Sequence, residues 1–145
     1  MRINSIARAM AILGVLAFGT AAQAAEDEAL SAELRQVVER KLAGFNSEDP
    51  AETMRHVHTK SPEYSVTEEA LPVQFEELDA RSKIVSFRYI GHDDEFAVAR
   101  VKLETVDQSG EPFSANVIDT ITLFHQENGE WKFWSDYVLG VELVQ

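Results

Sequence analysis

Apolar residues near the start of the chain follow the period of an amphipathic α-helix. Between Glu26 and Phe45 they recur at steps of three and four, which places them on one helical face. These residues are Leu30, Leu34, Val37, Val38, Leu42 and Phe45. The sequence therefore predicts a long first helix with one face directed at a core.

Two shorter helical segments are predicted after this helix. Asp49-Pro50 offers an N-cap followed by a first-turn proline, and Glu52 is placed to complete a capping box. This second helix is expected to end near Val57. A third segment is expected from about Thr67, made irregular by an internal proline. Its apolar face comprises Leu71, Phe75 and Leu78.

The pattern changes to that of β-strands from residue 82 onward. Strands are predicted over 82–90 and 95–106, followed by a long hairpin over 113–141. Asn128-Gly129 divides the hairpin and readily supplies the two positive φ angles of a type I′ turn. Helices followed by four strands predict an α+β domain, and no repeat or linker divides residues 25–145.

A two-residue turn at Asn128-Gly129 predicts the register of the hairpin. The predicted pairs are Glu127 with Glu130, Phe124 with Phe133, Ile121 with Asp136, and Asp119 with Val138. One face then carries Val117, Asp119, Ile121, Leu123, Trp134, Asp136 and Val138. The other carries Ile118, Thr120, Thr122, Phe124, Trp131, Phe133, Tyr137 and Leu139.

Both predicted faces are largely apolar, whereas the helices can cover only one of them. The other face is therefore expected to meet a second copy of the chain in a homodimer, because a large exposed apolar patch is unusual in a monomer. The alternative is a sheet curved strongly enough for one monomer to wrap both faces.

Two aspartates within the apolar hairpin are candidate catalytic residues. In the predicted register Asp119 and Asp136 lie diagonally across one face, roughly 7–8 Å apart and beside Trp134. Asp119 follows Val117 and Ile118, so partial desolvation is expected to raise its pKa and allow it to donate a proton to a substrate carbonyl. The alternative is a structural aspartate, hydrogen-bonded to a helix end or across a dimer.

The first 24 residues have the pattern of a secretory signal peptide. Arg2 and Arg8 precede an apolar core over 9–18. Ala22 and Ala24 place small residues at the two positions by which a signal-peptide cleavage site is recognised. The core is shorter than the roughly 20 residues of a membrane-spanning helix. Removal of residues 1–24 is therefore expected to leave a periplasmic or secreted domain over 25–145, without disulfides because the chain has no cysteine.

Charge argues against two classes of partner. Residues 25–145 contain 25 acidic and 11 basic side chains, a net charge of −14. Nucleic acid and anionic membrane surfaces are therefore not expected partners.

No cofactor or metal is indicated by the sequence. His56 and His58 are the closest histidine pair, but a two-residue spacing directs them to opposite sides of a helix and no third ligand is evident. There is no glycine-rich phosphate loop and no nucleophile elbow around a serine.

Four segments resemble the nuclear transport factor 2-like superfamily, which includes the SnoaL-like and steroid Δ5-isomerase branches. They are FNSED over 45–49, FAVARV over 96–101, VID over 117–119 and NGEWKF over 128–133. The resemblance implies a strongly bent antiparallel sheet wrapped around a long N-terminal helix, as in cystatin-like folds. It also implies a cone whose open end is a pocket, and dimerisation through the sheet.

The isomerase branch suggests roles for individual residues. In that branch an aspartate in a similar Val-Ile-Asp strand donates a hydrogen bond to the substrate oxygen, and Asp119 falls at this position. The branch's first-helix tyrosine falls on Lys41. Its aspartate base falls near Ser65, where Glu63 is the nearest carboxylate and Tyr64 lies between them.

The sequence leaves three hypotheses for function. The first is a domain that binds a small apolar ligand or a protein partner in its cone, without a cofactor. The pocket residues expected for it are His58, Tyr64, Ile121, Trp134 and Val138. The second is a cofactor-independent isomerase, dehydratase or cyclase, with Asp119 as acid or oxyanion donor and Asp136 or Glu63 as base. The third is a cone filled by its own Trp and Phe side chains.

Overall fold

The computed structural model describes residues 13–109 and 115–144, with side chains from residue 21 onward. Much of the predicted apolar leader, and Phe113 at the predicted start of the hairpin, lie outside the described residues. The chain divides into two compact units that meet at Leu30 and Ser31. The architecture described below is that of the second unit, which contains the whole sheet.

Three helices precede the sheet. They are α1 (Leu13–Asn46), α2 (Pro50–Arg55) and α3 (Tyr64–Glu77). Helix α1 begins earlier than predicted and continues through Ala24, the predicted end of the leader. Its predicted apolar face is confirmed over the second unit, where Leu34, Val37 and Val38 are buried.

Helix α2 begins where the sequence predicts. The Asp49 carboxylate accepts a hydrogen bond from the backbone N–H of Glu52 at 2.9 Å, and Pro50 occupies the first turn. The reciprocal bond of a capping box is not made, because the Asp49 N–H donates to the carbonyl of Gly44 and the Glu52 side chain contacts His56 at 3.1 Å. The first two helices are thus joined by a direct backbone bond.

Helix α3 begins three residues earlier than predicted and passes through Pro72 without a break. The early start follows from Ser61, whose hydroxyl accepts from the Glu63 N–H and whose carbonyl accepts from the Tyr64 N–H. Pro72 is exposed, so the carbonyl one turn earlier loses its helical donor on the solvent side of the helix. Leu78 follows the helix in extended conformation.

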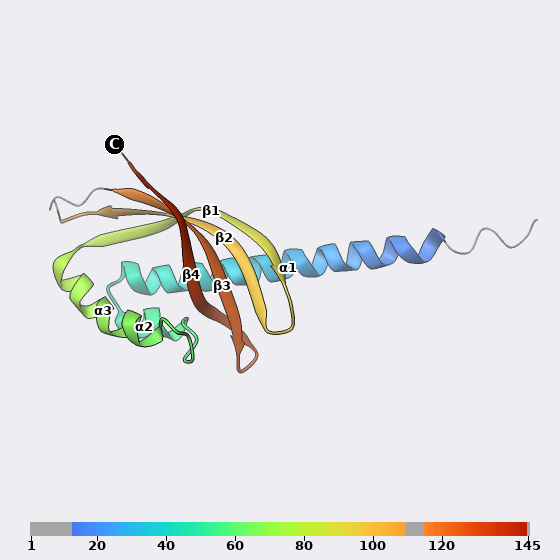
Figure 1. Ribbon diagram of the computed structural model, residues 1–145, viewed down its shortest axis with the longest axis horizontal. Helices are drawn as coiled ribbons and strands as arrows, with labels where there is room; N and C mark the ends of the chain where they lie inside the picture. The colour runs from blue at the N-terminus through green and yellow to red at the C-terminus, as the bar shows by residue number, and fades with distance from the viewer. Residues whose placement is uncertain (1–12, 110–114, 145) are drawn as a thin grey trace, which may run out of the picture. The chain divides into compact units, whose positions relative to one another are not determined.

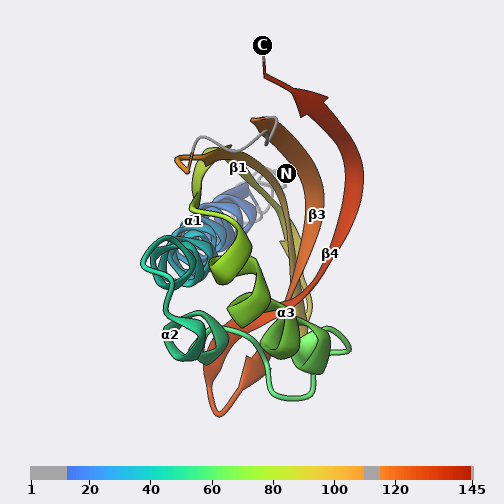
Figure 2. The ribbon, with the colours of Figure 1, turned by 90° about the vertical axis from the view of Figure 1, so that its left-hand side faces the viewer.

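The sheet is an antiparallel meander of β1 (Ala80–His92), β2 (Phe96–Asp107), β3 (Asn116–Glu127) and β4 (Glu130–Leu143), in that spatial order (Figure 1). The predicted turn is confirmed, since Asn128 and Gly129 have φ angles of 54° and 82°. Figure 2 shows the sheet curving around the helices, with α1 on its inner side. The predicted α+β class and bent-sheet architecture are confirmed.

The predicted hairpin register is correct near the turn and wrong beyond Phe124. Phe124 opposes Phe133 as expected, but two bulges follow, at Trp134 and Leu139. Each adds an unpaired residue to β4 and bends it. Between the two bulges the pairs are Thr122 with Asp136, Ile121 with Tyr137, and Thr120 with Val138, and beyond the second bulge Asp119 pairs with Gly140.

The first bulge lies where β4 meets a second neighbour. The N–H of Phe133 donates to the carbonyl of His56, and the N–H of His58 donates to the carbonyl of Phe133, both at 2.9 Å. The Ser61 hydroxyl then donates to the carbonyl of Trp134 at 2.5 Å. The segment after α2 therefore holds this part of β4 in place, a long-range contact that the hairpin sequence does not reveal.

The core lies between α1 and the inner face of the sheet. Its sheet residues are Ala97, Ala99, Val101, Phe124, Trp131 and Phe133, all buried. Phe133 also belongs to a cluster with Met54, Val57 and Leu71, against which Phe45, Tyr64 and Phe75 pack. Phe124, Trp131 and Phe133, which would form a large exposed patch on an uncovered sheet face, are thus buried within the monomer.

Candidate functional site

Asp119 lies on the outer face of the sheet and is fixed there by two cations. The Arg100 guanidinium donates to both of its oxygens, at 2.8 and 2.5 Å, and the Lys102 ammonium lies at 3.5 Å. The hydrogen bond from Arg100 is the main cause that lowers the pKa of Asp119, to about 2. The predicted raised pKa is therefore wrong, and this carboxylate is ionised at neutral pH.

Asp136 lies on the opposite, inner face, so the two aspartates do not form the predicted pair. The Thr122 hydroxyl donates to its carboxylate at 2.6 Å, and the Thr120 and Thr122 hydroxyls lie 3.1 Å apart. The backbone N–H of Asp136 donates to the Glu63 carboxylate at 3.2 Å. The bulge at Trp134 causes this change, because one extra residue reverses the faces of those that follow.

Lys41 is the charged residue that the sequence analysis did not assign to the site. Its side chain is half-buried on the inner side of α1, and Nζ lies 3.5 Å from the centroid of the Phe133 ring. Burial lowers the pKa of Lys41, against the opposing charges of Asp136 and Glu63. Among the described residues the ammonium has no hydrogen bond or ion pair.

A cavity of about 220 Å³ adjoins Lys41. It is lined by Lys41, Leu42, Phe45, Thr53, Thr67, Leu71, Gln74, Ser82 and Leu103. These residues come from all three helices and the first two strands, so the cavity lies on the inner side of the cone. Its walls are mainly apolar, and Lys41 is its only cationic lining residue within the described part of the chain.

The five predicted pocket residues do not share one pocket. Tyr64 lines a separate outer groove of about 580 Å³, together with Met54 and Pro72. Ile121 lies on the outer face opposite Arg100. Val138 is on the inner side but 62% exposed near the open end.

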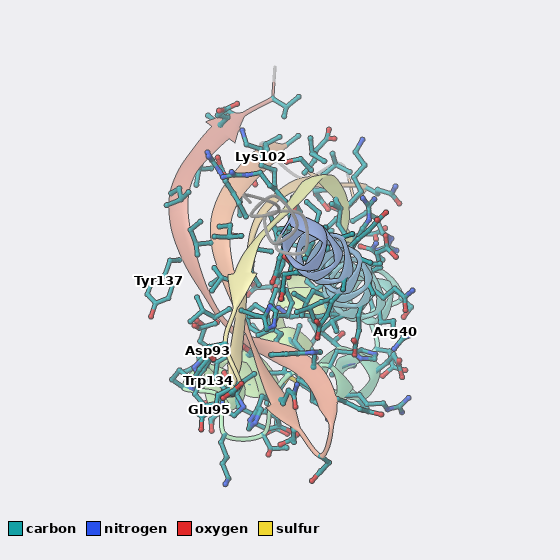
Figure 3. The ribbon with its side chains drawn as sticks, turned by 90° about the vertical axis from the view of Figure 1, so that its right-hand side faces the viewer. Arg40, Asp93, Glu95, Lys102, Trp134 and Tyr137 are labelled. Carbon is teal, nitrogen blue, oxygen red and sulfur yellow. The ribbon has the colours of Figure 1, made fainter. Side chains whose placement is uncertain are left out.

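His58 and Trp134 form an aromatic cluster with His125 and Phe96. The His58 and Trp134 ring centroids are 4.9 Å apart, and His125 stacks on Trp134 at the same separation. Figure 3 places Trp134 beside Asp93 and Glu95 at one end of the sheet. These rings pack on one another, and none of them lines the cavity beside Lys41.

Glu127 holds the hairpin end to the segment after α2, and this contact is expected to be sensitive to acid. Burial acts to raise the pKa of Glu127, but hydrogen bonds from Thr59 and Lys132 outweigh it and lower the pKa to about 2. A lowered pKa stabilises the fold above the unfolded-state value and loses that effect as the pH falls. The free energy of unfolding should therefore decrease between pH 4.5 and about 2.

Urea unfolding at several pH values tests this expectation. Glu127→Gln should be less stable than the wild type at pH 7 and should lose less stability on acidification, since Asp119 retains its own dependence. Glu130→Gln, exposed across the turn, is the matched control. Identical pH profiles for wild type and Glu127→Gln would contradict the assignment.

In the described part of the chain, no helix is long and apolar enough to cross a membrane. No three His, Cys, Asp or Glu side chains gather among these residues as metal ligands.

The fold is that of nuclear transport factor 2-like and cystatin-like proteins. A scytalone dehydratase-like protein from Novosphingobium aromaticivorans is 7% identical, with a TM-score of 0.66 over 83% of this chain and 92% of that one. A conserved protein from Planctomyces limnophilus is 16% identical, with a TM-score of 0.67 over 81% and 99%. An NTF2-like protein from Pseudomonas putida is 10% identical, with a TM-score of 0.63 over 77% and 86%. At these identities the likeness establishes the fold alone.

The family is established by sequence. Residues 36–144 match the family described as the C-terminal domain of anti-sigma-I factor RsgI9, and the chain belongs to this family. The matched range includes Lys41, Glu63 and Asp136 and all four strands. Among curated proteins, none matches the chain.

Proposed function

We propose that this domain binds a small molecule in the cavity beside Lys41. The observation that supports it best is the Lys41 ammonium, a half-buried donor at the cavity wall without a hydrogen-bond acceptor among the described residues. An unpaired buried charge is costly, and a ligand oxygen would reduce that cost.

The cavity suggests the chemical class of the ligand. Its volume of about 220 Å³ is below the usual range of drug-sized pockets, so a single ring or short chain fits best. Leu42, Leu71 and Leu103 favour an apolar body. Asp136 and Glu63 oppose the charge of Lys41, so a neutral carbonyl or hydroxyl group is favoured over a carboxylate.

The geometry gives less support to an enzyme that uses Asp119. A carboxylate with a pKa of about 2, paired with Arg100 on the outer face, is a poor proton donor and does not face the cavity. Any reaction in the cone would have to use Lys41 with Asp136 or Glu63. Binding therefore remains the leading function.

NMR titration with cyclohexanone and cyclohexanol tests the proposal. Both neutral compounds should shift signals of the cavity residues Leu42 and Leu103. Lys41→Met should bind them about 10- to 100-fold more weakly, because a hydrogen bond from a charged donor is lost, while its stability should not fall. Lys60→Met, which removes an exposed lysine, is the matched control and should bind normally. Absence of binding, or equal affinity of Lys41→Met, would refute the proposal.

We also propose that residues 1–24 are removed on export and that the periplasmic or secreted domain is a homodimer. The basic, apolar and small-residue pattern of the leader supports the first statement. Exposed apolar residues along β4 support the second.

A further inference from the structure

We propose that Lys41 forms a reversible imine with a small ketone or aldehyde held in its cavity, so that the site captures carbonyl compounds covalently. This inference rests on the proposed ligand site and extends it from recognition to reaction. The observation behind it is a primary amine at the wall of an apolar cavity, half-buried and without a hydrogen bond among the described residues.

The position of Lys41 on α1 directs the amine inward. Val37 lies one turn before it and Phe45 one turn after it, on the buried stripe of the helix. The Phe133 ring covers one side of the amine at 3.5 Å, and the cavity adjoins another. A carbonyl group that enters the cavity would therefore meet the nitrogen directly.

The other four lysines lack this environment. Lys83, Lys102 and Lys132 form ion pairs with carboxylates at 2.7, 3.5 and 3.0 Å. Lys60 is exposed. Burial lowers the pKa of Lys41, which increases its share of uncharged, nucleophilic amine at neutral pH.

The reaction needs the two reactants, one nearby carboxylate and solvent water, which carries protons to and from Asp136 because Lys41 and Asp136 are not in direct contact. The Lys41 ammonium first loses a proton through water to Asp136, and the free amine then attacks the carbonyl carbon as the carbonyl π bond breaks. The proton returns from Asp136 through water to that oxygen, giving a carbinolamine protonated on nitrogen. Transfer of the nitrogen proton by the same route to the hydroxyl group then lets it leave as water, and the C–O bond breaks as C=N forms. The balance is ammonium plus carbonyl compound giving iminium plus water.

Asp136 is the residue assigned to these proton transfers because it lies on the inner face of the sheet, opposite Thr122. Its charge, like that of Glu63, acts on Lys41. The Thr122 hydroxyl fixes one of its oxygens at 2.6 Å. Both carboxylates also raise the pKa of Lys41. Removing either negative charge should therefore lower this pKa further, so that Lys41 loses its proton at lower pH.

Reductive trapping tests the inference on the full chain. The protein is incubated with cyclohexanone and sodium cyanoborohydride, and modified residues are located by peptide mass spectrometry. Lys41 should gain one cyclohexyl group about ten-fold faster than any other lysine. Lys41→Arg should lose this modification, whereas the control Lys60→Arg should retain it. Asp136→Asn should react more slowly at its optimum and should reach half-maximal labelling at lower pH than the wild type.

The outcomes separate this inference from the proposed function. If cyclohexanone and cyclohexanol bind in the cavity but reduction leaves Lys41 unmodified, the imine is refuted and the ligand site stands. If neither compound binds and Lys41 reacts no faster than Lys60, both proposals fail. An unchanged pH profile in Asp136→Asn would refute the role of that carboxylate.

Discussion

Replacing Gly44 by alanine is expected to lower the free energy of unfolding by about 3 kcal/mol, the upper part of the range for overpacking. An added Cβ would lie 2.5 Å from the backbone nitrogen of Thr53 and 2.9 Å from its Cα. These are backbone atoms of α2, which cannot rotate away as a side chain could. The Asp49 N–H bond to the Gly44 carbonyl, at 3.0 Å, holds the two helices at this distance.

Gly44→Ala is expected to destabilise the protein, whereas the same substitution at an ordinary helical glycine stabilises it. In an exposed helix interior, alanine stabilises relative to glycine by roughly 0.5–1 kcal/mol. At Gly44 the contact with α2 outweighs that gain. Phe45 and Thr53 line the cavity, so displacement of α2 should also weaken ligand binding.

Urea unfolding followed by circular dichroism measures the effect. Gly91→Ala is the matched control, because no atom lies within 4 Å of the added carbon, the backbone is not left-handed and the residue lies on β1, away from the proposed dimer interface. Its stability should change by no more than about 0.5 kcal/mol. If Gly44→Ala is as stable as Gly91→Ala, the close approach of α1 and α2 is not a feature of the folded protein.

Local patterns predicted most of the fold. The apolar stripe of α1, the Asp49-Pro50 start of α2 and the Asn128-Gly129 turn each depend on neighbours within a few residues, and all three are confirmed. The start of α3 was predicted too late because the hydroxyl of Ser61, before the helix, organises its first turn. The predicted boundary of a helix is thus wrong where a side chain outside the periodic apolar pattern forms the hydrogen bonds that begin the helix.

The site was harder to predict because it depends on contacts between distant segments. No residue type marks the bulges at Trp134 and Leu139, yet the bulge at Trp134 decides that Asp119 and Asp136 lie on opposite faces. Lys41 did carry a signal, because it occupies the apolar stripe between Val37 and Phe45. A lysine at such a position is worth testing as a functional residue before an aspartate in an alternating strand.

The structure changes the expected interface of the proposed homodimer. The outer face of the sheet carries Arg100, Lys102 and Asp119 near its centre, which does not suit an apolar face-to-face contact. The second half of β4 and the residue after it are apolar and exposed instead, with Tyr137, Val138, Leu139, Val141, Leu143 and Val144. Figure 3 shows Tyr137 projecting away from the sheet.

This part of β4 also has an unpaired edge. One side of β4 pairs with β3, and among the described residues its other side is bonded only between Phe133 and Asp136, by the segment after α2. Exposed apolar edge strands favour pairing with another chain. We propose that two copies pair their β4 strands antiparallel about Gly140. This pairing would bring the exposed apolar residues on each face of one β4 strand against those of the other copy.

Val141→Lys is expected to raise the dissociation constant of this dimer about 100-fold, which corresponds to about 2.7 kcal/mol. Val141 is 57% exposed, so the variant should fold, and two-fold symmetry places two lysines in each interface. The lysine reduces the negative net charge, so dissociation could not result from greater overall repulsion. Val66→Lys, on an equally apolar but separate exposed site of α3, should leave the dimer intact.

Native mass spectrometry of protein recovered from the periplasm measures both proposals on one sample. The wild type and Val66→Lys should have twice the mass of residues 25–145, and Val141→Lys should have that mass once. A wild-type dimer that Val141→Lys leaves intact would place the interface away from the β4 edge. A monomeric wild type at concentrations where the exposed strand should pair would refute the dimer, and a protomer that retains residues 1–24 would refute cleavage of the leader.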